Sequence, residues 1–408
     1  MEVFSCLSHL QCTRCNRTFA VDERIQTCSC GAPLLARYDL QQASRHLTKA
    51  HLRERPCTLW RYHELLPVRD PHFVVSMNES MTPLIPLHAT GRHMDVPHLI
   101  LKDEGALPSG TFKARGASVG VSKAMELGES SLAITTNGNA GAAWSLYAAR
   151  AGIHISVVMP IDAPVTSRKE CALAGADLSV IHGTIADGGQ LVQRLVAQSG
   201  GYDVSTLKEP YRLEGKKTMG FEIAEQFDWS APDVIVYPTG GGAGVIGIYK
   251  AFRELQELGW IGSRLPRLVV VQAEGCAPLV RAFQKGEHTS TPWKNPETIA
   301  FGMRVPKALG DFLILDALYQ TTGTAVSVGD GEIVRERGEV ARRDGVHVCP
   351  EGAAALAGVR RLRQQGWIGD NETVLVMNTG SGLKYVDQLS AGGREIDLQE
   401  SSALVSNI

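Results

Sequence analysis

One lysine, Lys113, lies where its amine could act as a nucleophile. Turn-forming residues precede it, among them Pro108 and Gly110, and apolar residues at helical spacing follow it from Ala117. The pattern therefore predicts that Lys113 opens a helix directly after a tight turn. The positive end of a helix dipole disfavours a cation, so the pKa of this lysine should fall towards the neutral amine that Schiff-base chemistry needs. The alternative is a solvated surface lysine, the usual fate of this residue type.

Three further segments each follow a predicted strand, which is where ligands gather in open α/β sheets. Segment 135–143, TTNGNAGAA, opens a helix whose free N–H groups suit a substrate carboxylate. Segment 238–244, PTGGGAG, also opens a helix and predicts a nest of N–H groups for a phosphate. Segment 378–384, NTGSGLK, offers hydroxyl groups next to glycines. Ordinary capped turns are the alternative interpretation of the first and third segments.

Two lysines and an arginine fall within six residues at Arg212, Lys216 and Lys217. Such a group could bind a phosphate, with the arginine as the bidentate partner. The alternative is a solvated charged loop.

Four of the nine cysteines form two close pairs near the N-terminus, at Cys12, Cys15, Cys28 and Cys30. Two such pairs on short turns can surround Zn²⁺ tetrahedrally, and the segment has few apolar residues to hold it together otherwise. We therefore predict a structural zinc site. The alternative is four reduced thiols. An odd number of cysteines argues against a disulfide framework and for a reducing compartment.

The composition limits the partners and the location of the chain. Of its 408 residues 44% are hydrophobic and 21% charged, and the formal net charge is −2, so no nucleic-acid or membrane partner is indicated. The N-terminus lacks the basic region and apolar core of a signal peptide, and no apolar run approaches the ~20 residues of a membrane helix. We therefore expect a cytoplasmic protein.

From residue 98 onward, short β-branched runs alternate with helical patterns. This alternation predicts an α/β fold with two open, mostly parallel lobes. We expect the following division of the chain: a zinc-ribbon-like segment (1–40), a link that includes part of the large lobe (41–97), a smaller α/β lobe (98–200), a large α/β lobe (201–389) and a polar tail (390–408).

Segment 102–116, KDEGALPSGTFKARG, resembles the lysine loop of fold-type II pyridoxal-phosphate enzymes, and most of all the threonine synthase branch. Three further motifs of the family follow in the family's order. They are the asparagine loop (segment 135–143), the glycine loop (segment 238–244) and the Thr-Gly-Ser-Gly-Leu-Lys motif (in segment 378–384). The N-terminal cysteine ribbon is similar to an extension found in many threonine synthases. The resemblance implies that Lys113 carries the cofactor as a Schiff base and is the catalytic residue.

The resemblance also implies roles for other residues. Asn139 would bond the cofactor's 3-hydroxyl oxygen, and Thr379, with Ser381 second, would face the pyridine nitrogen. The remaining cofactor contacts would be Phe112, Gly240, Gly241, Gly242, Ala243 and Gly244. The substrate contacts would be Thr136, Asn137 and Arg212, with Arg212 on the phosphate.

The implied reaction converts O-phospho-L-homoserine and water to L-threonine and phosphate, in a homodimer. Several residues depart from the family pattern. Ser80 replaces a glycine, Asn137 a hydroxyl residue, Glu209 an asparagine and Lys216 a glutamine, and Thr206-Leu207 stands where polar residues are expected. Two alternatives therefore stay open. One is elimination or β-replacement on another amino acid, as in a serine/threonine dehydratase or a cysteate synthase. The other is a non-catalytic, ligand-binding paralogue.

Overall fold

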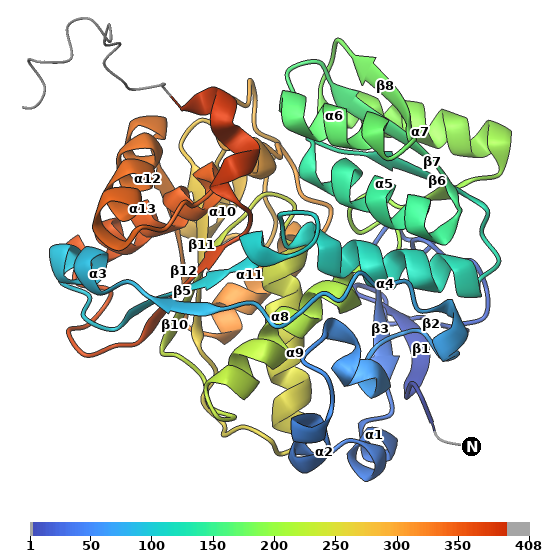
Figure 1. Ribbon diagram of the computed structural model, residues 1–408, viewed down its shortest axis with the longest axis horizontal. Helices are drawn as coiled ribbons and strands as arrows, with labels where there is room; N and C mark the ends of the chain where they lie inside the picture. Colours follow the sequence, from blue (N-terminus) through green and yellow to red (C-terminus); the bar gives the residue numbers. More distant parts are fainter. Residues whose placement is uncertain (1–2, 390–408) are drawn as a thin grey trace, which may run out of the picture.

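The computed structural model describes residues 3–389, and the predicted polar tail (390–408) lies outside them. Two sheets lie in separate lobes, and a third, small sheet lies near the N-terminus (Figure 1). No helix within residues 3–389 is long and apolar enough to cross a membrane.

The larger lobe is built on a six-stranded sheet of order β12-β11-β10-β13-β5-β4, parallel except for β4. Its strands are short apolar runs with both faces covered, as expected of a parallel sheet. Alternate residues of β10 belong to two different hydrophobic cores, one on each face of the sheet. The strands are β4 (Leu84–Pro86), β5 (Leu99–Asp103), β10 (Val234–Pro238), β11 (Arg267–Ala273), β12 (Thr324–Val328) and β13 (Val374–Asn378).

The smaller lobe is built on a four-stranded parallel sheet of order β8-β7-β6-β9. One face packs on α4 and α5, and the other packs on α7. The strands are β6 (Ser131–Thr135), β7 (His154–Pro160), β8 (Asp177–Ile181) and β9 (Tyr202–Asp203). The helices of this lobe are α4 (Lys113–Glu126), α5 (Asn139–Ala151), α6 (Val165–Leu173) and α7 (Ile185–Ser199).

The remaining helices cover the large sheet or link it to the N-terminal region. They are α1 (Leu40–His46), α2 (Lys49–Glu54), α3 (His88–Met94), α8 (Arg212–Gln226), α9 (Ala243–Glu257), α10 (Pro278–Gln284), α11 (Asp311–Gln320), α12 (Asp330–Asp344) and α13 (Pro350–Gln364). Short 3-10 segments are η1 (Leu59–Leu65), η2 (Pro71–Phe73), η3 (Glu104–Ala106), η4 (Phe301–Met303) and η5 (Gly382–Gln388).

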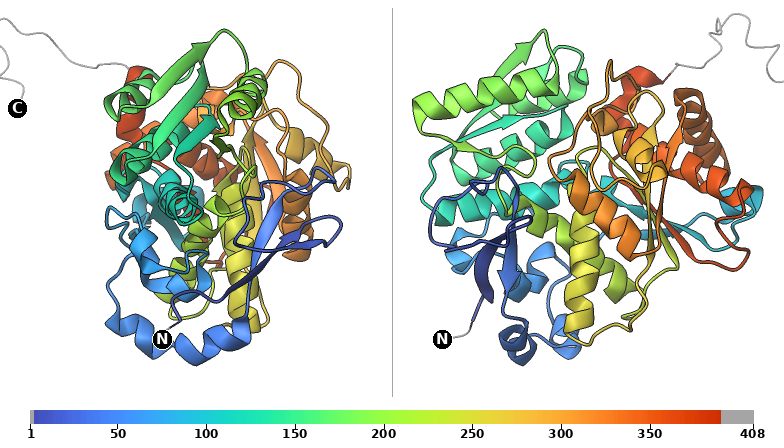
Figure 2. Two further views of the ribbon diagram at one scale, coloured as in Figure 1. Left: turned by 90° about the vertical axis from the view of Figure 1, so that its right-hand side faces the viewer. Right: turned by 180° about the vertical axis from the view of Figure 1, so that it is seen from behind.

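The small N-terminal sheet is antiparallel, with the order β2-β1-β3. Its strands are β1 (Leu7–Cys12), β2 (Thr18–Phe19) and β3 (Leu34–Tyr38). It lies beside α8 and α9 (Figure 2), where the ring of Tyr38 contacts the ammonium groups of Lys217 and Lys250 at 3.9 and 4.8 Å. These contacts join the small N-terminal sheet to the two helices.

The fold differs from the sequence-based expectation in two places. We predict a smaller lobe that starts at residue 98, whereas β5 pairs with β13 and β4 in the six-stranded sheet. The apolar spacing in the sequence predicts a helix only over Phe221–Gln226, whereas α8 begins at Arg212. The first turns of α8 are buried but carry charged residues, so they lack the apolar periodicity that reveals a helix.

A buried network of charges joins α4 of the smaller lobe to the large lobe. Arg115, two residues after Lys113, donates to both oxygens of Glu104 at 2.6 and 2.8 Å. It also donates to both oxygens of Glu222 in α8, which accepts from Lys102 of β5 at 3.0 Å. These four side chains are at most 1% exposed. The network therefore links α4, η3, α8 and β5 at one point.

Replacing Arg115 with methionine leaves Glu104 and Glu222 buried without their main cation. We expect Arg115→Met to lower the free energy of unfolding by about 3–5 kcal/mol, measured by urea denaturation. Arg264→Met is the matched control, because the side chain of Arg264 is 76% exposed and its pair with Asp233 should contribute less than about 1 kcal/mol. Equal losses in the two variants would contradict the importance of the buried network.

Candidate active site

Lys113 is the first residue of α4, as the sequence pattern predicts. The loop before it is held by the segment that follows β13, far away in the sequence. The backbone N–H of Phe112 donates to the carbonyl of Thr379 at 3.0 Å, and that of Ser381 donates to the carbonyl of Gly110 at 2.8 Å. The lysine loop and the Thr-Gly-Ser-Gly motif therefore lie against each other.

The amine of Lys113 lies in an environment that favours its neutral form. Its Nζ atom is 4.3 Å from the centre of the Phe112 ring. Burial lowers the pKa of Lys113 to about 8, the charge of Arg212 acts in the same direction, and Glu351 opposes them. The lowered pKa was predicted from the helix dipole, but burial and a neighbouring cation are its main causes here.

The glycine loop supplies a set of free backbone donors at the start of α9. Within residues 3–389, no backbone N–H from Gly240 to Gly244 donates a hydrogen bond, and no side chain caps the helix. Gly242 adopts φ +76°, which a residue with a side chain rarely adopts. A Cβ atom on Gly240 would lie 2.3 Å from the carbonyl oxygen of Gly302. The loop can therefore bind an anion through its backbone, and its shape requires glycine.

An aromatic contact places the glycine loop near Lys113. The rings of Phe112 and Tyr237 meet edge to face, with their centres 6.1 Å apart. Tyr237 is the penultimate residue of β10, just before the glycine loop, and a Cβ atom on Gly244 would lie 1.9 Å from its hydroxyl oxygen.

Asn139 is the first residue of α5, and its amide donates to the hydroxyl of Tyr385 at 2.7 Å. Tyr385 donates in turn to Glu351 at 3.2 Å, while the second carboxylate oxygen of Glu351 is buried without a partner among the described residues. Neither Tyr385 nor Glu351 was predicted as a site residue. Glu351 is the second residue of α13, where a carboxylate commonly only stabilises the helix dipole. Its position in the sequence therefore does not indicate a site residue.

Thr136 and Asn137, the predicted substrate contacts in the asparagine loop, make hydrogen bonds within the protein. Thr136 accepts from the backbone N–H groups of Gly138 and Gly141, which shapes the turn into α5. The amide of Asn137 donates to the carbonyls of Phe301 and Arg304 at 3.3 and 2.8 Å. Asn137 thus joins the smaller lobe to the loop around η4.

Thr379 and Ser381 have different surroundings. The hydroxyl of Thr379 is 3.8 Å from the thiol of Cys349, and the residue is 7% exposed. The hydroxyl of Ser381 accepts from the backbone N–H of Leu383 at 3.2 Å and caps η5. Of the two hydroxyl groups, only that of Ser381 caps a helix, so the hydroxyl of Thr379 is the better candidate to contact a ligand.

Arg212 is the first residue of α8 and is 1% exposed. Its guanidinium donates to the carbonyl of Val204 at 2.7 Å, while its Nε atom has no hydrogen-bond partner among the described residues. Glu209 accepts from the backbone N–H of Arg212 and lies 3.8 Å from its side chain. Arg212 is therefore a buried cation with an N–H donor that no hydrogen bond uses. Its charge is close enough to Lys113 to lower the pKa of that lysine.

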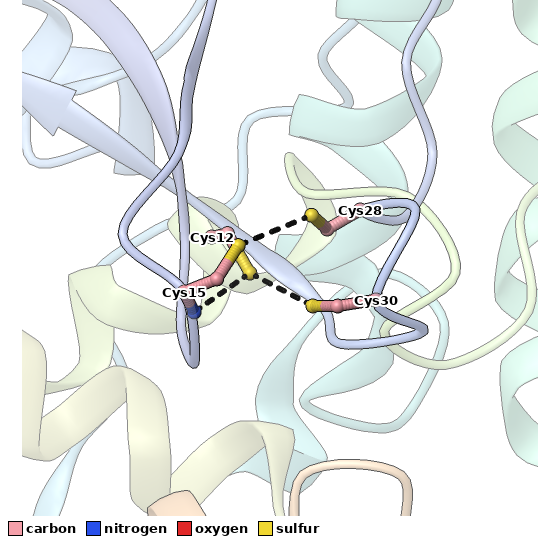
Figure 3. Close-up of side chains that lie close together, drawn as sticks. All are labelled: Cys12, Cys15, Cys28 and Cys30. Atoms are coloured by element: carbon pink, nitrogen blue, oxygen red, sulfur yellow. Dashed lines mark hydrogen bonds between the residues drawn. The ribbon is translucent and has the colours of Figure 1, made fainter.

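The four N-terminal cysteines converge on one point (Figure 3), with all four sulfur atoms within 4.8 Å of one another. The Sγ atom of Cys12 is 3.4 Å from that of Cys30, and the Sγ atoms of Cys15 and Cys28 are 3.5 Å apart. Tetrahedral Zn²⁺ with Zn–S bonds of about 2.3 Å separates its sulfurs by roughly 3.8 Å, so the cluster fits such an ion. The predicted ligands are together and could hold a metal ion.

Residues 75–380 match the family model described as pyridoxal-phosphate dependent enzyme. The threonine synthase of Methanosarcina acetivorans is 40% identical over 379 residues, which are 92% of each chain. That of Methanocaldococcus jannaschii is 36% identical over 378 residues, 92% of this chain and 93% of its own. The structure of maize serine racemase matches with a TM-score of 0.63 at 21% identity, over 80% of this chain and 92% of that one, and so supports the fold.

We expect the purified protein to contain one zinc ion per chain, measured by elemental mass spectrometry. Replacing Cys12 and Cys15 with serine should remove the metal and lower the melting temperature, because the small sheet buries few apolar side chains. Cys57→Ser is the control, since that thiol is exposed and lies outside the cluster. A metal content unchanged by the double substitution would contradict the predicted site.

Proposed function

The chain belongs to the family of pyridoxal-phosphate dependent enzymes, and within it to the threonine synthases, and on that premise we propose that it converts O-phospho-L-homoserine and water to L-threonine and phosphate. The observation that supports this substrate most directly is the buried Arg212, with unused donors, beside the amine of Lys113. A homodimer stays a prediction, which light scattering would test.

The residues around Lys113 fit pyridoxal phosphate. The unpaired N–H groups of the glycine loop suit its phosphate, the amine of Lys113 its aldehyde, and the neutral hydroxyl of Thr379 its pyridine nitrogen. The amide of Asn139 suits its ring oxygen. When bound, this cofactor supplies the electron sink that stabilises negative charge on the substrate carbons.

We assign proton transfer to Lys113. Once the substrate's own amine has displaced it, the free amine can accept a proton at Cα and return protons at neighbouring carbons. A pKa of about 8 suits both directions of transfer near neutral pH, because neither the amine nor the ammonium form is strongly disfavoured.

We assign substrate positioning to the N-termini of α5 and α8. The N-terminus of α5, with Thr136 and Asn137, would hold the substrate carboxylate through backbone N–H groups. Arg212, at the N-terminus of α8, would hold the phosphate that leaves. Asn137 would contribute its backbone N–H group, because its side-chain amide already donates to two carbonyls of the loop around η4.

The direct test supplies the holoenzyme with O-phospho-L-homoserine and measures released phosphate and threonine. We expect equal amounts of the two products, and a loss of activity of more than about 10³-fold in Lys113→Ala, which has no amine to move the protons. Keto acid without phosphate release, from serine or threonine, would instead favour the dehydratase alternative.

The pKa of Lys113 predicts how cofactor uptake depends on pH. The amine must be neutral to react with an aldehyde, so the rate at which the apoprotein takes up pyridoxal phosphate should rise as pH increases and level off above about pH 8. Absorbance in the visible range measures the rate. A rise that continues to the ordinary lysine pKa of about 10.4 would contradict the buried environment of Lys113.

A further inference from the structure

Lys216 is a buried lysine whose amine has no hydrogen-bond partner or ion pair among residues 3–389. It lies in α8 and is 2% exposed. The next residue, Lys217, is equally buried but pairs with Glu214 at 2.6 Å and Glu254 at 2.9 Å. An ammonium group taken out of water without a partner is costly, so the isolation of Lys216 calls for an anion that the protein itself does not supply.

The position of the Lys216 amine is fixed by the crossing of α4 and α8. A Cβ atom on Gly116 would lie 2.3 Å from Nζ of Lys216, so the amine occupies the space that the missing side chain leaves. The same Nζ atom is 5.4 Å from the centre of the Phe112 ring, over which the amine of Lys113 also lies. Lys216 therefore extends towards the reactive lysine.

The charges around Lys216 are mostly positive. Burial lowers its pKa well below the ordinary value, the charges of Arg212 and Lys113 lower it further, and Glu209 opposes them. Arg212 lies one helical turn earlier in α8, and its Nε atom has no hydrogen-bond partner among the described residues, with Glu209 3.8 Å away. Two cations with unused donors, one turn apart on one helix, form a site for an oxyanion that accepts from both.

We propose that Lys216 is a specificity-determining residue that binds the phosphate of the substrate together with Arg212. The proposal rests on the proposed function and deepens it by naming the second cation of the phosphate site. The cofactor's own phosphate is the other possible source of the anion. The substrate's phosphate is the better match, because the glycine loop already has free N–H groups for a cofactor phosphate.

The test compares Lys216→Gln with Lys217→Gln, two neighbouring substitutions that each remove one buried charge. In Lys216→Gln holoenzyme, KM for O-phospho-L-homoserine and the inhibition constant of inorganic phosphate should both rise roughly 10- to 100-fold, the range for a hydrogen bond to a charged group. The affinity for pyridoxal phosphate and for L-norvaline, an amino acid without a phosphate, should change less than about twofold.

Thermal unfolding gives a readout that does not depend on turnover. Without phosphate, Lys216→Gln should melt at or above the wild-type temperature because an unpaired buried amine is lost, whereas Lys217→Gln should melt lower because an ion pair is broken. Inorganic phosphate at ten times its dissociation constant should raise the melting temperature of the wild type and of Lys217→Gln by about 1–2 °C, but not that of Lys216→Gln. Lys216→Met should behave like Lys216→Gln.

Three results would overturn the assignment. The first is an unchanged KM and phosphate inhibition in Lys216→Gln, while the wild type still releases phosphate and threonine, which leaves the proposed function intact. The second is a selective loss of cofactor affinity, which would assign Lys216 to the cofactor's phosphate. The third is a wild type that is neither inhibited by phosphate nor active on O-phospho-L-homoserine, in which case the proposed function fails as well.

Discussion

The geometry of the site depends on the buried guanidinium of Arg115. It bonds two carboxylates, Glu104 and Glu222, that come from separate elements, and it lies two residues after Lys113. An uncompensated charge at this depth would cost several kcal/mol, so the three side chains must remain together in the folded protein. The start of α4, and with it Lys113, is thereby held against the large sheet and α8.

The Arg115 network brings the N-termini of α4 and α8 together, and with them three basic side chains. Helices α4 and α8 cross closely enough that a Cβ atom on Gly215 would lie 2.0 Å from the carbonyl oxygen of Arg115. Lys113, Arg212 and Lys216 all belong to these two helices. Burial and mutual repulsion lower the pKa of Lys113 and of Lys216, which suits nucleophilic chemistry at Lys113, and an oxyanion bound at Lys216 would restore the charged form of its amine.

The sequence predicts the parts of the site that rest on local patterns. Lys113 at a helix start, the glycine loop after β10 and the four converging cysteines are confirmed in position, because turn formers, strand runs and paired cysteines are short-range signals. The roles assigned to individual residues stay predictions. Tyr385, Glu351 and the isolation of Lys216 could not be predicted, because each depends on which side chains from distant elements meet, and no periodicity records that.

The most direct test of the central claim identifies the lysine that carries the cofactor. Two amines, those of Lys113 and Lys216, lie over the same ring, so a visible chromophore alone does not distinguish them. Borohydride reduction of the holoenzyme, followed by proteolysis and mass spectrometry, would locate the attached pyridoxyl group. We expect it on the peptide that contains Lys113 and at that residue alone. A label on Lys216 would contradict both the role of Lys113 and the proposed phosphate site.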